Sequence, residues 1–268
     1  MKAQRTGLVA SRRKTARAVA ALERAFGVPK WDGPEPPLDA LVRTVLSQST
    51  SDLNSGRAFE LLQAAFPTWA AAHAAGPERI EAAIRSGGLA RQKSRRIHKL
   101  LGWVRERFGS FCLDAVHRMP TEEVFETFLP LEGVGVKTVA VMLLFACGRD
   151  CFAVDTHVHR IVRRLGLAPP AAGADRTFWL MRPLVPPGKA LSFHLNLLRL
   201  GRTVCRPTAP KCPLCPLRRL CDYARNLPRV GNPREVLPEP GGEAVRAAGG
   251  GCGGRRGRPV RQRVPVRR

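Results

Sequence analysis

The 268-residue sequence predicts an all-α protein. Strand-like alternation of apolar and polar residues is scarce, Ala and Leu are abundant, and Gly and Pro divide the middle of the chain into short amphipathic segments. Hydrophobic residues make up 44% of the chain, and its length allows one domain or two closely packed lobes with a buried core. Helices are expected near residues 14–26, 38–48, 52–66, 77–86, 90–108, 121–129, 137–147, 156–165, 174–184 and 188–203.

Helix boundaries follow from helix-breaking residues. Pro36 and Pro37 stand where the second helix should begin, since proline is tolerated in the first turn. The pair Gly87 and Gly88 ends the fourth helix and separates it from the fifth. Pro120 precedes the sixth helix in the same way. The central part of the chain is therefore expected to be a series of helices joined by short turns.

The net charge of +24 is unusual and is unevenly distributed. Residues 1–20 carry six Lys or Arg and no acidic residue, and residues 229–268 carry ten Arg and three Glu. Without both ends the remaining residues still hold a net charge of +11. Such a charge favours a polyanionic partner, because each neutralised phosphate releases counterions. The Gly-, Pro- and Arg-rich residues 226–268 are expected to be disordered.

Compartment and membrane signals are few. No apolar run approaches the roughly 20 residues that a membrane helix needs, and no secretory signal is recognisable. Four of the eight cysteines fall within residues 205–221, which indicates a metal site in a reducing compartment. We expect the cytoplasm, in contact with the nucleoid of a bacterium, or the mitochondrion or nucleus of a eukaryote. The acid-free N-terminus also fits a mitochondrial transit peptide.

A glycine turn followed by a lysine is the most informative motif. In LEGVGVKTVAV, Gly133, Val134 and Gly135 form a tight turn whose backbone N–H groups, at a helix N-terminus, suit an anion such as a phosphate. Lys137 follows immediately, where the helix dipole and the flanking valines favour the neutral, nucleophilic amine. The alternatives are a plain turn between buried helices and a solvent-facing lysine that contacts phosphate. Asp155 begins the next helix and suits an N-cap.

The segments LEGVGVKTVAV and VDTHVHR resemble the helix-hairpin-helix DNA glycosylases of the endonuclease III type. The resemblance spans residues 14–225. It implies that Lys137 attacks C1′ of the damaged nucleotide, that Asp155 supports departure of the base, and that β-elimination then nicks the strand. These roles amount to covalent catalysis by an amine with electrostatic support from a carboxylate. Asp155 can cap a helix and serve catalysis at once.

The resemblance also implies a two-lobed fold with a DNA cleft between the lobes. The N-terminal helix is expected to join the later helices in one lobe, and the helix-hairpin-helix to belong to the other. The expected divisions are a basic arm at 1–13, one lobe from 14–37 and 149–203, a helical bundle at 38–148 with the hairpin motif at about 121–147, a cluster loop at 204–225 and the basic tail at 226–268.

The cysteine cluster consists of Cys205, Cys212, Cys215 and Cys221, separated by six, two and five residues. Four thiolates this close together can hold one ion or one cluster. Zinc is the chief alternative, although zinc modules usually have two Cys-x-x-Cys pairs and this chain has one. The spacing matches the [4Fe–4S] motif of endonuclease III-like proteins. By this resemblance the cluster has a structural and DNA-binding role, with Arg206 and Lys211 on its loop.

An enzyme that acts on C1′ inside a duplex must extrude the nucleotide and fill the gap. By resemblance, Gln48 enters the vacated stack and Leu89, on its glycine turn, is the apolar wedge. Without the resemblance, both are better explained as a loop glutamine and a core leucine. The cations of the following helix are expected to contact phosphate or to face solvent; they are Arg91, Lys93, Arg95 and Arg96.

The function expected from the resemblance is base excision repair. A monomer would remove damaged, oxidised pyrimidines from double-stranded DNA and cleave the abasic site. Glu132 and Val136 depart from the usual residues of endonuclease III, which leaves the lesion open. The alternatives are a glycosylase for mismatched bases or pyrimidine dimers and a cluster-bearing DNA-binding protein without catalysis. An adenine-mismatch glycosylase fits poorly, because such relatives lack the lysine at position 137 and have a further folded domain.

Overall fold

Helices provide all the regular secondary structure that the computed structural model describes, in residues 2–31 and 33–227. The all-α prediction is therefore confirmed. Most of the expected tail, from residue 228 onward, lies outside the described residues. In the described part, no helix combines the length and the apolar character that crossing a bilayer requires.

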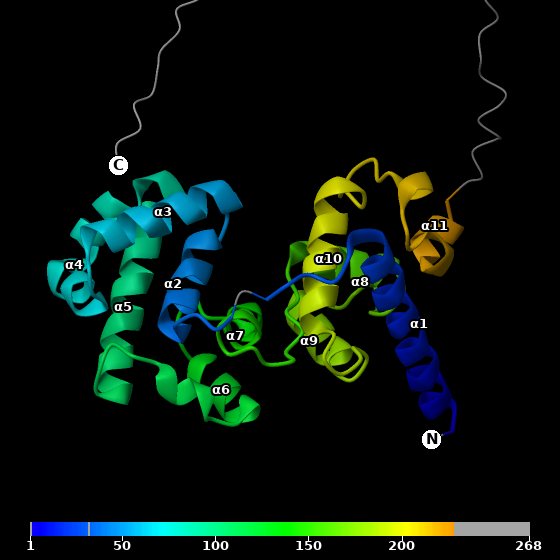
Figure 1. The fold of residues 1–268 in the computed structure, drawn as a ribbon, viewed down its shortest axis with the longest axis horizontal. Coiled ribbons are helices and arrows are strands. Elements are labelled where there is room, and N and C mark those ends of the chain that lie inside the picture. The colour runs from blue at the N-terminus through cyan, green and yellow to red at the C-terminus, as the bar shows by residue number, and fades with distance from the viewer. Residues whose placement is uncertain (1, 32, 228–268) are drawn as a thin grey trace, which may run out of the picture. The chain divides into compact units, whose positions relative to one another are not determined.

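Two groups of helices can be followed in Figure 1, and the chain passes twice between them. The first group contains α2 (Pro37–Ser47), α3 (Asp52–Ala65), α4 (Trp69–Ala83), α5 (Ala90–Phe108), α6 (Thr121–Phe128) and α7 (Val136–Val141), which continues as a π-helical turn at Met142–Ala146. The second contains α1 (Lys2–Phe26), α8 (Thr156–Arg164), α9 (Ala174–Met181), α10 (Ala190–Thr203) and α11 (Asp222–Arg225). Short 3₁₀ turns lie at Arg85–Gly87, Asp114–His117, Cys212–Leu214 and Arg218–Leu220.

Apolar side chains from both groups form one continuous core. In the first group α4 packs along α5, and α2 packs against α3 and α7. In the second group α10 packs against α1 and α8. The groups meet where α9 touches α7 and where α10 touches the π-helical turn. The core thus holds these helices in fixed positions, and a catalytic site built on such helices is placed more precisely than one on loops.

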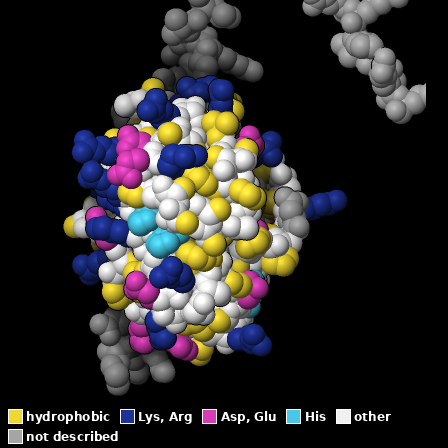
Figure 2. All heavy atoms as spheres, turned by 90° about the vertical axis from the view of Figure 1, so that its left-hand side faces the viewer, with side chains coloured by type: hydrophobic (Ala, Val, Ile, Leu, Met, Phe, Trp, Pro, Cys, Tyr) yellow, Lys and Arg dark blue, Asp and Glu magenta, His cyan; other side chains and the backbone are white. Residues whose placement is uncertain are grey.

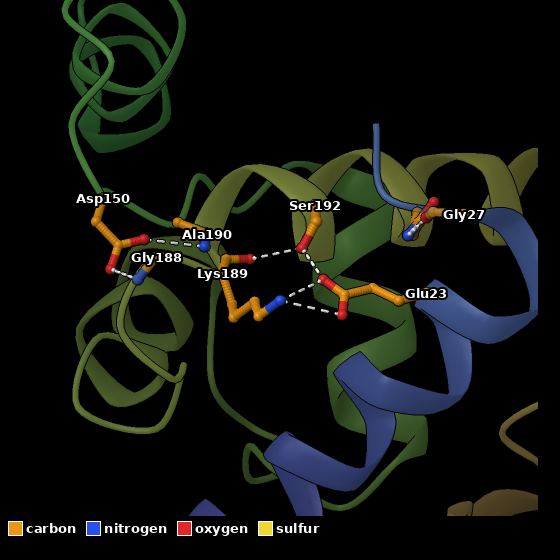
Figure 3. Close-up of polar contacts among 8 residues, drawn as sticks. Glu23, Gly27, Asp150, Gly188, Lys189, Ala190 and Ser192 are labelled. Atoms are coloured by element: carbon orange, nitrogen blue, oxygen red, sulfur yellow. Dashed lines mark hydrogen bonds and ion pairs between the residues drawn. The ribbon is translucent and has the colours of Figure 1, made fainter. Parts of the chain in front are cut away.

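Polar contacts fasten α1 to α10. Lys189 Nζ lies 3.1 and 3.2 Å from the two carboxylate oxygens of Glu23, and the Ser192 hydroxyl donates to Glu23 Oε1 at 2.7 Å (Figure 3). Burial alone would raise the pKa of Glu23, but Ser192 and Lys189 outweigh it and lower that pKa. Asn196 Nδ2 adds a hydrogen bond to Gly27 O at 3.0 Å. The first helix of the chain is thus held against one of the last.

The N-terminus of α10 is capped from a distance. Asp150, on the segment that leads from the first group to the second, accepts hydrogen bonds from Gly188 N at 2.7 Å and Ala190 N at 2.9 Å (Figure 3). A carboxylate at this end satisfies free N–H groups and opposes the positive end of the helix dipole. The helix begins at Ala190, two residues after the expected start at residue 188.

Two other helices differ from the sequence prediction. The expected arm at residues 1–13 is helical from Lys2 onward and belongs to α1, because good helix formers such as Ala, Lys and Arg outnumber the weaker ones in this stretch. The expected helix at 77–86 is the second half of α4, which begins at Trp69. Thr68 caps that start by accepting a hydrogen bond from Ala71 N at 3.1 Å, and Gly76, with φ +84°, bends the helix before Pro77.

Candidate active site

Lys137 is the second residue of α7, and its side chain is half-buried. Burial lowers the pKa of Lys137, while the nearby carboxylates of Asp155 and Asp52 act in the opposite direction. Desolvation disfavours the ammonium ion and leaves more of the amine neutral near physiological pH. The side chain therefore has the property that a nucleophilic amine needs.

Asp155 is the N-cap of α8. Its Oδ1 accepts a hydrogen bond from Val158 N at 2.7 Å, so the capping prediction is confirmed. This bond fixes the carboxylate at the start of α8, where it acts electrostatically on Lys137. The structure thus brings together a lysine and an aspartate that are 18 residues apart in the sequence.

His194 lies on α10 and is only 3% exposed. Its Nδ1 lies 2.9 Å from Ala153 O, two residues before Asp155. Burial lowers the pKa of His194. Asp155 acts in the opposite direction and raises that pKa, whereas Lys137 lowers it further. A buried histidine on an apolar helix face looks like an ordinary core residue in the sequence, so sequence reasoning missed it.

Asp52 is a second carboxylate that sequence reasoning missed. It is the first residue of α3 and is exposed, and it forms an ion pair with Arg202 near the end of α10. Through this pair the start of α3 is tied to the second group of helices. Nothing in the sequence near Asp52 indicates this pairing, because its partner lies 150 residues away.

Of the two glycines of the hairpin turn, one has the positive φ that a tight glycine turn predicts. Gly133 has a φ of +82°, which favours glycine, and a Cβ there would come within 2.9 Å of Arg96 Cδ, so the arginine side chain would have to shift. In the described part of the chain, no acceptor pairs with the backbone N–H groups of Gly135, Val136 or Lys137. These groups point out of the N-terminus of α7 as free donors for an anion.

Val134 does not fit the direct DNA contact that was expected of it. Its side chain is 6% exposed, and its N–H donates to Leu131 O at 3.0 Å. The hydrogen bond closes the turn, and the buried side chain anchors the turn in the core. Val134 therefore shapes the hairpin, while Gly135 and the residues after it supply the free donors.

Gln48 is placed differently from the expectation. It follows the last residue of α2, but both ends of its amide are occupied: Nε2 donates to Gly133 O at 3.0 Å, and Oε1 accepts from Arg96 Nη1 at 3.0 Å. Without DNA the half-buried side chain supports the hairpin, and both hydrogen bonds would have to break before it could enter a base stack. The next residue, the exposed Ser49, has a φ of +53° and stands at the tip of the loop.

Leu89 is exposed to 56% and has a φ of +49°, so the expected core explanation does not apply. It directly precedes α5, whose cations have different surroundings. Arg91 and Arg95 are exposed, as expected, but Lys93 is buried, at 1% exposure. The expectation of a phosphate contact or a solvated position is therefore wrong for Lys93, which lies on the same helix face as the buried residues Ile97 and Leu100.

The four cysteines line one small cavity together with Arg164 and Tyr223. Arg164 Nη1 donates to Cys205 Sγ at 3.2 Å. Burial raises the pKa of Cys215 to about 11, and the other three cysteines of the cavity add to this rise. In the described residues, no three His, Cys, Asp or Glu side chains already surround a metal position. Four thiols around one cavity nevertheless suit an iron–sulfur cluster.

The loop between the first two cysteines carries Arg206 and Lys211, both exposed. Its backbone is held by Arg164, which donates to Arg206 O at 2.7 Å and to Pro207 O at 2.8 Å. Ala209 within this loop has a φ of +46°. The loop therefore presents two cations to solvent on a fixed backbone.

Comparisons with known proteins agree with this geometry. The profile of the HhH-GPD superfamily of base excision DNA repair proteins matches residues 42–187. The chain belongs to this superfamily. The matched residues of this HhH-GPD protein include the hairpin, Lys137 and Asp155. Endonuclease III of Thermotoga maritima is 32% identical over 189 residues, which cover 70% of this chain and 84% of that protein.

Two further similarities are informative. A candidate DNA glycosylase of Arabidopsis thaliana is 39% identical over 161 residues, which cover 60% of this chain and 54% of that protein. A solved structure of a trapped covalent intermediate of endonuclease III with DNA matches with a TM-score of 0.68 and 26% identity, over 80% of this chain and 97% of that one. The HhH-GPD protein described here is thus an endonuclease III-like DNA glycosylase.

Proposed function

We propose that this protein is a bifunctional glycosylase that removes damaged, oxidised pyrimidines from double-stranded DNA and then cleaves the abasic site. One observation carries the proposal: the half-buried Lys137, whose pKa is lowered by burial, lies within the electrostatic reach of Asp155. The similarity to a trapped endonuclease III–DNA intermediate supports it. The protein is proposed to act as a monomer.

The reaction follows from a neutral amine beside a carboxylate. The Lys137 nitrogen bonds to C1′ as the bond from C1′ to the base breaks, and the base leaves with a proton. Asp155 stabilises the positive charge that develops on the sugar. Opening of the sugar ring gives an imine, loss of a C2′ proton expels the 3′ phosphate, and hydrolysis releases the enzyme. The strand is thereby cut 3′ to the lesion.

The hairpin is proposed to hold the DNA backbone during this sequence. The free N–H groups of Gly135, Val136 and Lys137 suit a phosphate oxygen at the positive end of α7. Leu89, Arg206 and Lys211 are proposed to contact DNA as well, since each is exposed on a loop. The backbone N–H of Lys137 would bind the phosphate, and its side-chain amine would remain available to attack the sugar.

Cys205, Cys212, Cys215 and Cys221 are proposed to hold a [4Fe–4S] cluster. The bound cluster would supply structural rigidity, and the exposed Arg206 and Lys211 of its loop would supply the positive charge that a phosphate backbone attracts. Arg160 and Arg164 already brace this region: Arg160 Nη2 donates to Cys205 O at 2.8 Å, and Arg164 contacts Cys205 Sγ. The chain's own contribution is to hold the loop of Arg206 and Lys211 against α8 through Arg160 and Arg164.

Borohydride trapping on DNA with an abasic site tests the lyase proposal. The wild-type protein should form a covalent adduct, and Lys137→Ala should lose it because no other amine has the same position. Lys99→Ala removes an exposed lysine that pairs with Glu132 and should keep the adduct. An adduct of normal yield in Lys137→Ala would contradict the proposal. Base release from thymine glycol, uracil and cyclobutane dimers, assayed side by side, then identifies the lesion.

Cys212→Ser tests the proposed cluster. The wild-type protein should be brown, with absorption at about 400 nm and iron bound, because thiolate-ligated iron–sulfur clusters have this colour. The variant should lose colour and iron. Cys112→Ser, at an exposed cysteine outside the cavity, is the matched control and should change neither. A colourless wild-type protein that contains zinc would support the alternative metal.

A further inference from the structure

Two loop tips beside the candidate site are held in a strained backbone conformation. In the described residues, only three non-glycine residues have a positive φ, and two of them are Ser49 at +53° and Leu89 at +49°. L-residues rarely adopt this conformation, and it persists only where the surrounding structure enforces it. Leu89 also keeps a large apolar side chain in solvent. Strained residues of this kind cluster at active sites and ligand-binding loops.

A single buried ammonium group holds both loops. Lys93 Nζ donates to Leu46 O at 2.7 Å and to Gly87 O at 2.7 Å. Leu46 lies three residues before Ser49, and Gly87 lies two residues before Leu89. The carbonyl groups belong to the last turn of α2 and to the 3₁₀ turn Arg85–Gly87, 41 residues apart along the chain. The lysine therefore fixes the element before the Ser49 loop relative to the element before Leu89.

Lysine suits this position because its ammonium has three donors and a long apolar stem. The stem passes through the core from α5, where Lys93 is 1% exposed. Burying the charge has a cost, as the lowered pKa of Lys93 indicates. The two hydrogen bonds to carbonyl groups, one of them in the last turn of α2, offset this cost.

The same helix secures the first loop a second time. Arg96, one turn after Lys93, holds the amide of Gln48, which in turn holds Gly133 of the hairpin. These contacts turn Gln48 inward and leave Ser49 at the exposed tip. Side chains of α5 therefore help to fix the positions of the hairpin, the Ser49 tip and the Leu89 tip.

We propose that Lys93 is a positioning residue for nucleotide extrusion: it sets the spacing of the Ser49 and Leu89 tips so that both enter the duplex together. This inference rests on the proposed function. Leu89 fills the space left by the extruded nucleotide, and Ser49, not Gln48, meets the same gap from the other loop. Lys93 touches neither the sugar nor the base.

Cleavage of an abasic site in two contexts tests this role. In a paired duplex the abasic nucleotide must be extruded, whereas in a single strand it is already accessible. Lys93→Met should slow cleavage of the duplex at least tenfold and cleavage of the single strand less than twofold. Lys99→Met, which removes an exposed charge from the same helix, should leave the ratio of the two rates unchanged. An equal loss on both substrates would overturn the proposal, as would no loss on either.

A double-mutant cycle separates positioning from a general loss of stability. If Lys93 acts through the two tips, then Lys93→Met should slow duplex cleavage less in a Leu89→Ala background than in the wild type, because one of the two tips has already lost its side chain. Independent, multiplying effects would overturn the proposal. Lys93→Arg keeps the donors and should recover part of the duplex rate if the first variant folds poorly.

A fluorescence measurement keeps the inference separate from the proposed chemistry. A 2-aminopurine placed opposite the abasic site should brighten when the wild-type protein binds and should brighten less with Lys93→Met. This signal needs no cleavage. If the wild-type protein gives the signal but never cleaves, the lyase proposal fails and the inference stands. If Lys93→Met brightens as much as the wild-type protein, the inference fails.

Discussion

At the scale of single residues, the candidate site depends on how Lys137 is surrounded. The sequence places a lysine next to apolar residues after a glycine turn, and from this the lowered pKa could be anticipated. Asp52 and His194, which also act electrostatically within this site, come from α3 and α10. Tertiary packing brings both residues near Lys137, and no local sequence pattern predicts it.

The pH dependence of trapping should report these surroundings. The neutral amine forms as the pH rises through the lowered pKa of Lys137, so the trapping rate should rise with pH. Asp155 favours the ammonium form and thereby raises that pKa. Asp155→Asn should move the midpoint of the rising limb to lower pH and should also reduce the maximum rate, since the carboxylate no longer stabilises the sugar cation.

Asn is the appropriate substitution because it can still cap α8. Asp52→Asn should shift the midpoint in the same direction but by less, since the carboxylate of Asp52 acts on Lys137 more weakly than that of Asp155. The measurement is the rate of borohydride trapping across a pH series. A midpoint that stays in place or moves to higher pH in Asp155→Asn would show that the carboxylate does not act on the lysine.

Lys93 and Gln48 show where residue-level reasoning from the sequence failed. Lys93 was grouped with its basic neighbours, although its spacing to Ile97 and Leu100 places it on the apolar stripe of the helix. That signal was present in the sequence. For Gln48 there was none, because its partners Gly133 and Arg96 are 85 and 48 residues away.

At the scale of helices, caps and breakers account for most boundaries. Prolines, glycines and capping side chains act locally, so the starts of α2, α3, α6 and α8 agree with the sequence prediction to within one residue. The start of α10 does not, because its cap comes from Asp150 across the fold. A helix end that is satisfied by a distant carboxylate leaves no trace in the neighbouring sequence.

Asp150→Ala should destabilise the fold through α10. The substitution leaves two backbone N–H groups without their acceptor and removes a favourable charge from the helix N-terminus. The free energy of unfolding in urea should fall by about 1 to 2 kcal/mol. Asp175→Ala, in the exposed first turn of α9, is the comparison and should cost less than about 0.5 kcal/mol. Equal losses in the two variants would refute the capping role.

At the scale of the whole molecule, charge is the dominant feature. Lys and Arg outnumber Asp and Glu by 45 to 21, and much of the excess lies at the two ends of the chain. On the face shown in Figure 2, Lys and Arg side chains are more numerous along one edge than in the middle, which is mostly uncharged. On this face a polyanion would therefore meet most of the positive charge at the edge.

The residues from 228 onward should add to DNA affinity without taking part in the chemistry. Residues 229–268 carry a net charge of +7, which a chain ending at Leu227 lacks. The shorter chain should bind undamaged DNA more weakly, and its affinity should fall less steeply with salt, by a slope of about 0.9 for each lost phosphate contact. Its trapping rate at saturating DNA should match that of the full chain. Identical salt slopes would show that these residues make no phosphate contacts.

The sequence by itself determined the all-α class, the hairpin with its lysine, the capping aspartate and the spacing of the four cysteines. These features are local, because helix periodicity, glycine turns and short ligand spacings are written within some 20 residues. The tertiary structure decided which side chains surround Lys137, which way Gln48 turns and what Lys93 holds. Those outcomes depend on contacts between helices distant in the chain, and burial in a shared core sets them.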